Sequence, residues 1–177
     1  GVHRGAETTL DISADLDELS RTNVCVVCAG VKSILDIGLT LEYLETKGVP
    51  VIGYKTSELP AFYSTKSGFN VDYRIDAAID IASILKTKWD LSIDGGVLVT
   101  NPIPVAFELE SSVMNEAINL AIIEADNENI TGKKITPYLL SKVNEITKGK
   151  SLDANIKLIK NNADLAAKIA VHFSKID

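Results

Sequence analysis

The chain has 177 residues, enough for one domain with a sizeable core. Apolar residues make up 46% and charged residues 24%, which are values of a globular protein rather than a disordered one. The 18 basic and 24 acidic side chains give a net charge of −6 without a cationic stripe, so neither nucleic acid nor an anionic membrane surface is expected as a partner. No apolar run reaches the roughly 18 residues that cross a bilayer.

The first half of the chain alternates predicted strands and helices. A short strand is expected over 8–13, and residues 23–29 are apolar on both faces, which is typical of a central strand covered by helices on each side. A helix is predicted over 33–47, where Gly48 stops it, and a strand over 49–54. Strand, helix and strand in this order predict a parallel pair with a right-handed crossover.

The second half is predicted to be mainly helical. Residues 56–70 show no period and are expected to form a long loop, which a length above about 12 residues marks as functional. After this loop a helix is predicted over 72–88 and one further strand over 95–101. Helices are then predicted over 112–127, 136–148 and 151–176. The sequence thus predicts a single α/β domain with a helical C-terminal third.

Two cysteines, Cys25 and Cys28, are too few for a disulfide scaffold, so a reducing, cytoplasmic or otherwise intracellular setting is expected. They fit a CxxC pattern, but on a strand their side chains point to opposite faces and cannot chelate one zinc ion. The chain begins without Met and without a secretory signal pattern. We therefore expect it to be a piece of a longer protein.

Lys32 follows the predicted central strand, at the end where open α/β sheets place their ligands. Lys-Ser before a helix invites comparison with a phosphate-binding P-loop, but Val31 and Val26 stand where that motif needs glycine. The positive end of the predicted helix and partial burial would both disfavour the ammonium form. A neutral amine can attack a carbonyl-level carbon and form a Schiff base, whereas the alternative is an ordinary solvated lysine.

Oxygen-bearing side chains recur at every second residue in Asp11, Ser13 and Asp15. The segment is not an EF-hand, because Leu16 and Thr22 occupy the positions of the required Gly and Glu. On an extended backbone the three groups could converge on a metal ion or a sugar. The alternative is the end of a strand followed by a turn, with Asp15 or Asp17 capping a short helix.

Three further polar positions are weaker candidates. His3 and Arg4 could contact a substrate or a phosphate, or belong to a frayed end. Asn101 leaves its strand before a rigid Pro-Ile-Pro exit and could face a ligand or simply make a turn. Asn155 lies in the first turn of the last predicted helix, where either an anion or solvent could face it.

Several stretches together resemble the pseudouridine-5′-phosphate glycosidase family, also called indigoidine-synthase-A-like. The resemblance runs through the whole chain in the same order and is carried by GVHRGA (1–6), DISADL (11–16), VCAGVKSILD (27–36), TLEYLET (40–46), LPAFY (59–63), NPIP (101–104) and SLDANI (151–156). It implies a three-layer α/β/α sandwich with a mixed, largely parallel sheet, assembled as a homotrimer. It also implies reversible cleavage of pseudouridine 5′-phosphate to uracil and ribose 5-phosphate.

The resemblance assigns a role to each matching residue. Lys32 corresponds to the catalytic lysine that holds the opened ribose as an imine, and Val31 replaces the alanine usual before it. Asp11 corresponds to the residue that anchors a divalent cation, typically Mn²⁺, largely through waters. The remaining matches form the substrate-binding stretch and the active-site wall: Ser13, Ala14 and Asp15, of which Asp15 also handles protons, and His3 and Asn155, of which His3 is expected to be catalytic.

Chemistry supports a lysine in this reaction, because a C–C glycosidic bond has no leaving-group oxygen that an ordinary pair of carboxylates could protonate. An iminium at C1′ supplies the electron sink. The chain corresponds to the C-terminal part of the family, and the absent N-terminal part normally supplies a proton-donating glutamate, a substrate lysine and contacts to uracil. We expect the chain alone to be inactive. Two alternatives stay open, a non-catalytic ligand- or metal-binding subunit with the family fold and an aldolase-like Schiff-base enzyme.

Overall fold

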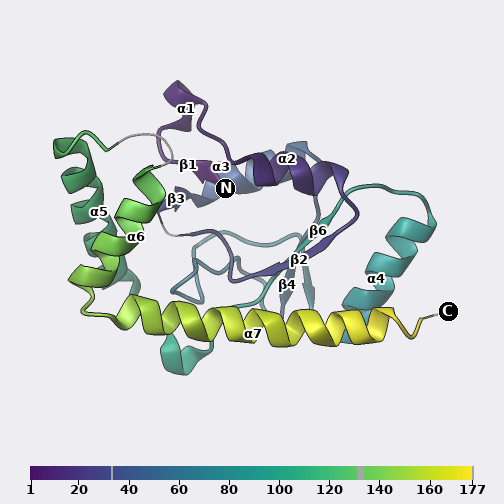
Figure 1. Ribbon diagram of the computed structural model, residues 1–177. Coiled ribbons are helices and arrows are strands. Elements are labelled where there is room, and N and C mark those ends of the chain that lie inside the picture. The colour runs from purple at the N-terminus through teal and green to yellow at the C-terminus, as the bar shows by residue number, and fades with distance from the viewer. Residues whose placement is uncertain (33, 131–133, 177) are drawn as a thin grey trace.

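A four-stranded parallel sheet forms the centre of the computed structural model, which describes residues 1–32, 34–130 and 134–176 (Figure 1). Its spatial order is β2 (Cys25–Cys28), β6 (Val97–Thr100), β4 (Val51–Tyr54) and β5 (Tyr73–Ile75). All three pairings are parallel. The carboxyl ends of the strands therefore meet at one edge of the sheet, as the predicted crossovers require.

Helices cover both faces of this sheet and make three layers (Figure 1). On one face lie α2 (Ala14–Arg21) and α3 (Ile37–Thr46), and on the other lie α4 (Ala78–Asp90) and the C-terminal half of α7 (Lys150–Phe173). The helices α5 (Ser111–Asn127) and α6 (Ile135–Ile146) pack against each other beside the sheet. The predicted α/β/α fold with a helical C-terminal third is confirmed.

Two apolar cores hold the layers together. Strand residues alternate between them, because successive side chains on a strand point to opposite faces. Val51 and Leu98 pack with the α2 and α3 leucines, whereas Ile52, Val97 and Val99 pack with α4 and α7. The largest fully buried side chains include Leu44, Leu59, Ile81, Leu85, Ile103, Ile118 and Leu158.

The strand predicted over 8–13 is wrong. Residues Ala6–Thr9 form a short helix, α1, and the segment after it makes only one bridge, between Val2 and Ile12. The hydroxyls of Thr8 and Thr9 both donate to the carbonyl oxygen of Gly5, at 3.0 and 3.2 Å. Such local hydrogen bonds let threonine compete with strand formation despite its β propensity.

The helix predicted from residue 33 begins later, at Ile37. Asp36 caps it, since its carboxylate accepts from the backbone N–H of Leu39 at 2.8 Å. The preceding pair, β3 (Leu35–Asp36), joins β1 (Val2–His3) in a separate antiparallel ribbon. The antiparallel part of the predicted mixed sheet is this ribbon, and within the described residues the main sheet is wholly parallel.

Two other expectations differ from the structure. Strand β2 was expected in the centre of the sheet, but it lies at the edge of the described sheet although helices cover both its faces. The helix predicted over 72–88 is preceded by β5, and α4 begins only at Ala78. The remaining short element is the 3₁₀ turn η1 (Val105–Phe107). The described residues hold no helix long and apolar enough to cross a membrane.

Candidate active site beside Lys32

A tight backbone contact places Lys32. Gly30, two residues after β2 ends, has φ +83° and pairs with Ala61 of the long loop. A Cβ at this position would lie 1.7 Å from the carbonyl oxygen of Pro60, so only glycine fits. The carbonyl oxygen of Lys32 then accepts from the N–H of Leu35 at 2.9 Å, which turns the chain toward β3.

The Lys32 side chain is exposed and lies on this turn, five residues before α3 begins. The expectation that a helix N-terminus and partial burial act on its amine is therefore wrong, because the structure supplies neither. The neighbouring Ser33 lies outside the described residues.

A cavity beside Lys32 brings four of the predicted site residues together. Its volume is about 310 Å³, and Lys32, Asp15, Ser13 and His3 all line it. A lysine, a carboxylate, a hydroxyl and an imidazole thus share one space, although they come from different elements.

The segment that carries Ser13 and Asp15 is held in place by its own helix start. The Ser13 hydroxyl caps α2, since its oxygen accepts from the N–H of Asp15 at 3.3 Å. Backbone bonds tie the segment to the first residues: His3 N–H donates to the Asp11 oxygen and Ser13 N–H to the Gly1 oxygen, both at 3.0 Å. A capped helix start is present, as the alternative expected, but it follows no strand and its cap is Ser13 in place of Asp15 or Asp17. The same cap orients Ser13 and Asp15 at the cavity.

Asp11 lines a neighbouring cavity of about 180 Å³, which it shares with His3 and Arg4. Its carboxylate oxygen lies 3.8 Å from Nδ1 of His3, and its side chain is 47% exposed. Within residues 1–32, 34–130 and 134–176, no group of three or more His, Cys, Asp or Glu is arranged to hold a metal ion. The side chains present therefore offer a divalent cation one carboxylate, and water would have to complete its shell.

Other candidates lie apart from the Lys32 cavity. Ala14 is an exposed residue at the start of α2, and Asn155 is half-buried on α7 and does not line this cavity. Asn101 is buried and structural: its side-chain amide donates to Asn161 and Asn162 of α7, at 3.2 Å each. The exit from β6 is thereby tied to α7 rather than presented to a ligand.

The two cysteines of β2 face different cores, as predicted. Cys25 packs toward α4 and α7, and Cys28 packs toward α2 and α3. Burial raises the pKa of each thiol to about 11. At neutral pH both are therefore protonated packing groups.

Comparison with models of known protein families identifies the family of this chain. The model of the family described as "Indigoidine synthase A like protein" matches residues 1–172. The chain belongs to this family.

Relatives of this chain have names that are more specific than the description of the family. Pseudouridine-5′-phosphate glycosidase of Geobacillus kaustophilus is 63% identical over 98% of the chain, and that of Clostridium botulinum is 59% identical over all of it. The crystal structure of the prealnumycin C-glycosynthase AlnA in complex with ribulose 5-phosphate matches 98% of the chain with a TM-score of 0.91 and 37% identity. The chain spans 58% of the two relatives' length and 57% of AlnA.

Sequence reasoning missed one contributor to the Lys32 cavity. Thr136, the second residue of α6, lines it, whereas Arg4, which lines the cavity that holds Asp11, was already a candidate. Thr136 was interpreted only as part of a helix start, more than 100 residues along the chain from Lys32. A single sequence carries no signal that joins such distant positions.

Proposed function

We propose that this chain is part of an enzyme that reversibly cleaves the C–C glycosidic bond of pseudouridine 5′-phosphate. The observation that carries the proposal is the amine of Lys32 in one cavity with Asp15, Ser13 and His3. The names of the relatives support the substrate. AlnA supports the chemistry, since that C-glycosynthase was crystallised with a phosphorylated keto sugar.

The proposed reaction uses Lys32 as nucleophile. Its amine bonds to C1′ of the sugar, the bond from C1′ to the ring oxygen breaks, and that oxygen takes up a proton. The nitrogen lone pair then forms a C1′=N double bond while the electrons of the C1′–C5 bond pass to the uracil ring, which is protonated at C5. Water adds to the iminium carbon and releases ribose 5-phosphate and the amine, so one water is consumed overall.

The neighbouring groups suit the proton transfers that this scheme needs. Asp15 is exposed to the cavity and is the carboxylate that can take a proton from the Lys32 ammonium. Ser13 and His3 can donate hydrogen bonds to the hydroxyls of the opened sugar. The roles of Ala14 and Asn155 in substrate binding, the divalent cation at Asp11 and the homotrimer stay predictions.

The remaining part of the protein is proposed to supply the groups that this chain lacks for the reaction. Because the chain spans under three fifths of the relatives' length, groups that contact uracil and protonate the sugar are assigned to the remaining part. Lys32, which lines the cavity, is exposed. We expect the chain alone to be inactive and the chain joined to the remaining part to be active.

The test is uracil release from pseudouridine 5′-phosphate by the complete protein, followed by ultraviolet absorbance. We expect Lys32→Met to lower kcat/KM by at least about 10³-fold, because it removes the nucleophile. The matched control is Lys160→Met, which removes an exposed lysine on α7 and leaves the rate unchanged.

Undiminished release by Lys32→Met would overturn the mechanism. The reverse direction separates the alternatives. Consumption of ribose 5-phosphate that requires uracil supports the C-glycosidase, whereas consumption without uracil identifies an aldolase-like enzyme. No turnover in either direction by the complete protein would favour the non-catalytic binding subunit.

A further inference from the structure

Thr136 brings a hydroxyl to the Lys32 cavity from a distant part of the chain. The other polar residues that line this cavity come from positions 1–40, whereas Thr136 is the second residue of α6. Its side chain is half-buried. The reaction scheme proposed above uses groups from positions 3–32 and gives Thr136 no task.

Packing and pairing with α5 fix the start of α6 beside the cavity. Leu139, one turn after Thr136, is buried in the core. Lys142 of α6 pairs with Glu124 of α5, with 2.9 Å between Nζ and Oε2. Pro137 also restricts the backbone of the residue before it. The position of Thr136 in the cavity wall is therefore set by the fold and does not depend on a ligand.

The other hydroxyls of this cavity already serve the fold. The oxygen of Thr40 accepts from the N–H of Val2 at 2.9 Å, and its hydroxyl donates to the carbonyl oxygen of Asp36 at 2.5 Å. The oxygen of Ser13 caps α2. The Thr136 hydroxyl makes no hydrogen bond with any residue that the structure describes. Because threonine on a helix uses two rotamers, this hydroxyl can turn into the cavity.

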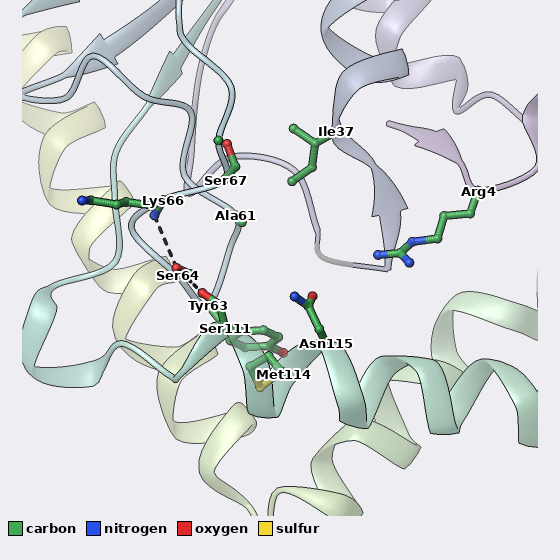
Figure 2. Close-up of a pocket in the computed structure, with 11 residues that line it drawn as sticks. Arg4, Ile37, Ala61, Tyr63, Ser64, Lys66, Ser67, Ser111, Met114 and Asn115 are labelled. Carbon is green, nitrogen blue, oxygen red and sulfur yellow. Dashed lines mark hydrogen bonds between the residues drawn. The ribbon is translucent and has the colours of Figure 1, made fainter.

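The cavity on the other side of the Gly30 turn shows how the fold uses hydroxyls as structural links (Figure 2). There the oxygen of Ser64 accepts from Ser111 at 2.9 Å, and the Ser64 hydroxyl donates to Glu108 at 3.1 Å. These bonds tie the long loop to the start of α5. Thr136 has no such link, so the fold gives its hydroxyl no structural task.

Much of the wall around Thr136 is apolar. It is formed in part by five leucines, namely Leu16, Leu19, Leu35, Leu44 and Leu98. An opened ribose carries a hydroxyl on each of several neighbouring carbons, and a hydroxyl that is buried without a partner is unfavourable. Asp15, Ser13 and His3 reach the sugar from the first residues of the chain, so a hydroxyl from α6 adds a partner from a separate element.

We propose that Thr136 is a substrate-positioning residue, whose side chain forms a hydrogen bond with a hydroxyl of the sugar held at Lys32. A threonine hydroxyl can both donate and accept, which suits a sugar hydroxyl that does the same. The bond keeps the carbon chain of the sugar in one orientation while the amine attacks. This inference rests on the proposed function, because that function places the sugar beside Lys32.

Two substitutions in the complete protein separate hydrogen bonding from packing. Thr136→Val keeps the shape and removes the hydroxyl, so we expect it to lower kcat/KM for uracil-dependent consumption of ribose 5-phosphate by about tenfold. Thr136→Ser keeps the hydroxyl and loses only the methyl group, so its kcat/KM should stay within about twofold of the wild type. Thr87→Val changes an exposed threonine of α4 and is the control, with no expected change. A tolerated valine with a damaging serine would show a packing role and overturn the inference.

A binding measurement distinguishes failure of this inference from failure of the proposed function. The complete protein with Lys32→Met, which cannot form the imine, is titrated with ribose 5-phosphate by calorimetry, with and without Thr136→Val. We expect the valine to weaken binding by about fivefold or more while the midpoint of thermal unfolding stays the same. Weaker binding without any uracil release in the wild type would support the sugar contact and reject the proposed reaction. Equal affinities, or no binding to either protein, would overturn the inference whatever the uracil assay shows.

Discussion

Lys32 stands at its cavity because of a glycine two residues earlier. Any side chain on Gly30 would collide with the Pro60 carbonyl, so this residue fixes both the end of β2 and the approach of the long loop. The sequence placed Lys32 correctly after a strand. It could not show that the chain turns before the helix begins, because that turn depends on Pro60 and Ala61, some 30 residues away.

Replacing Gly30 with alanine should therefore be severely destabilising. The added Cβ overlaps the Pro60 oxygen at 1.7 Å, and alanine also disfavours a φ of +83°. We expect Gly30→Ala to lower the free energy of unfolding by at least about 3 kcal/mol. Gly48→Ala is the control, because φ is +68° there with no atom within 4 Å, and its cost should be about 1 kcal/mol. Equal losses in urea denaturation would contradict the role of the Pro60 contact.

At the scale of the element, β2 shows how far a hydrophobic pattern reaches. Residues 23–29 are apolar at successive positions, so both faces of the strand were predicted to be buried, and each face does pack against helices. The pattern reports burial of the faces and not the number of neighbouring strands, so the position of β2 at the edge of the described sheet could not be predicted. In the same way, Asp36 looked like an interior helix residue although it is the cap.

Because the two thiols of β2 are buried, the free energy of unfolding of the chain is expected to fall at alkaline pH. Their pKa values are about 11 in the folded chain against 9.0 when unperturbed, so between these values the unfolded chain loses protons that the folded chain keeps. The free energy of unfolding must then fall as pH rises above 9, on the order of 2 kcal/mol per thiol by pH 11.

Thermal unfolding at pH 7.5, 9 and 10.5 measures this dependence. The wild-type midpoint should fall more steeply than that of the Cys25→Ala/Cys28→Ala double variant, with each protein compared with itself at pH 7.5. Parallel declines of the two proteins would show that the thiols are not responsible.

For the whole molecule, the fold was the most predictable property and the site was less so. The alternation of strands and helices predicts an α/β domain, and the resemblance implies the sandwich. The resemblance also named His3, Ser13, Asp15 and Lys32, which the structure brings to one cavity. Asn155 and Asp11 do not line that cavity, and Thr136 was not recognised as a contributor to it. These contacts arise between elements far apart in the chain, so local patterns do not reveal them.

The most direct test of the account is covalent trapping of the sugar on the protein. Ribose 5-phosphate and sodium borohydride are added to the complete protein, and the modified residue is located by peptide mass spectrometry. Reduction of an imine should leave one sugar phosphate on the peptide that contains Lys32, and Lys32→Met should abolish the adduct. An adduct on a different lysine, or unchanged uracil release without any adduct, would contradict the central claim that Lys32 is the nucleophile.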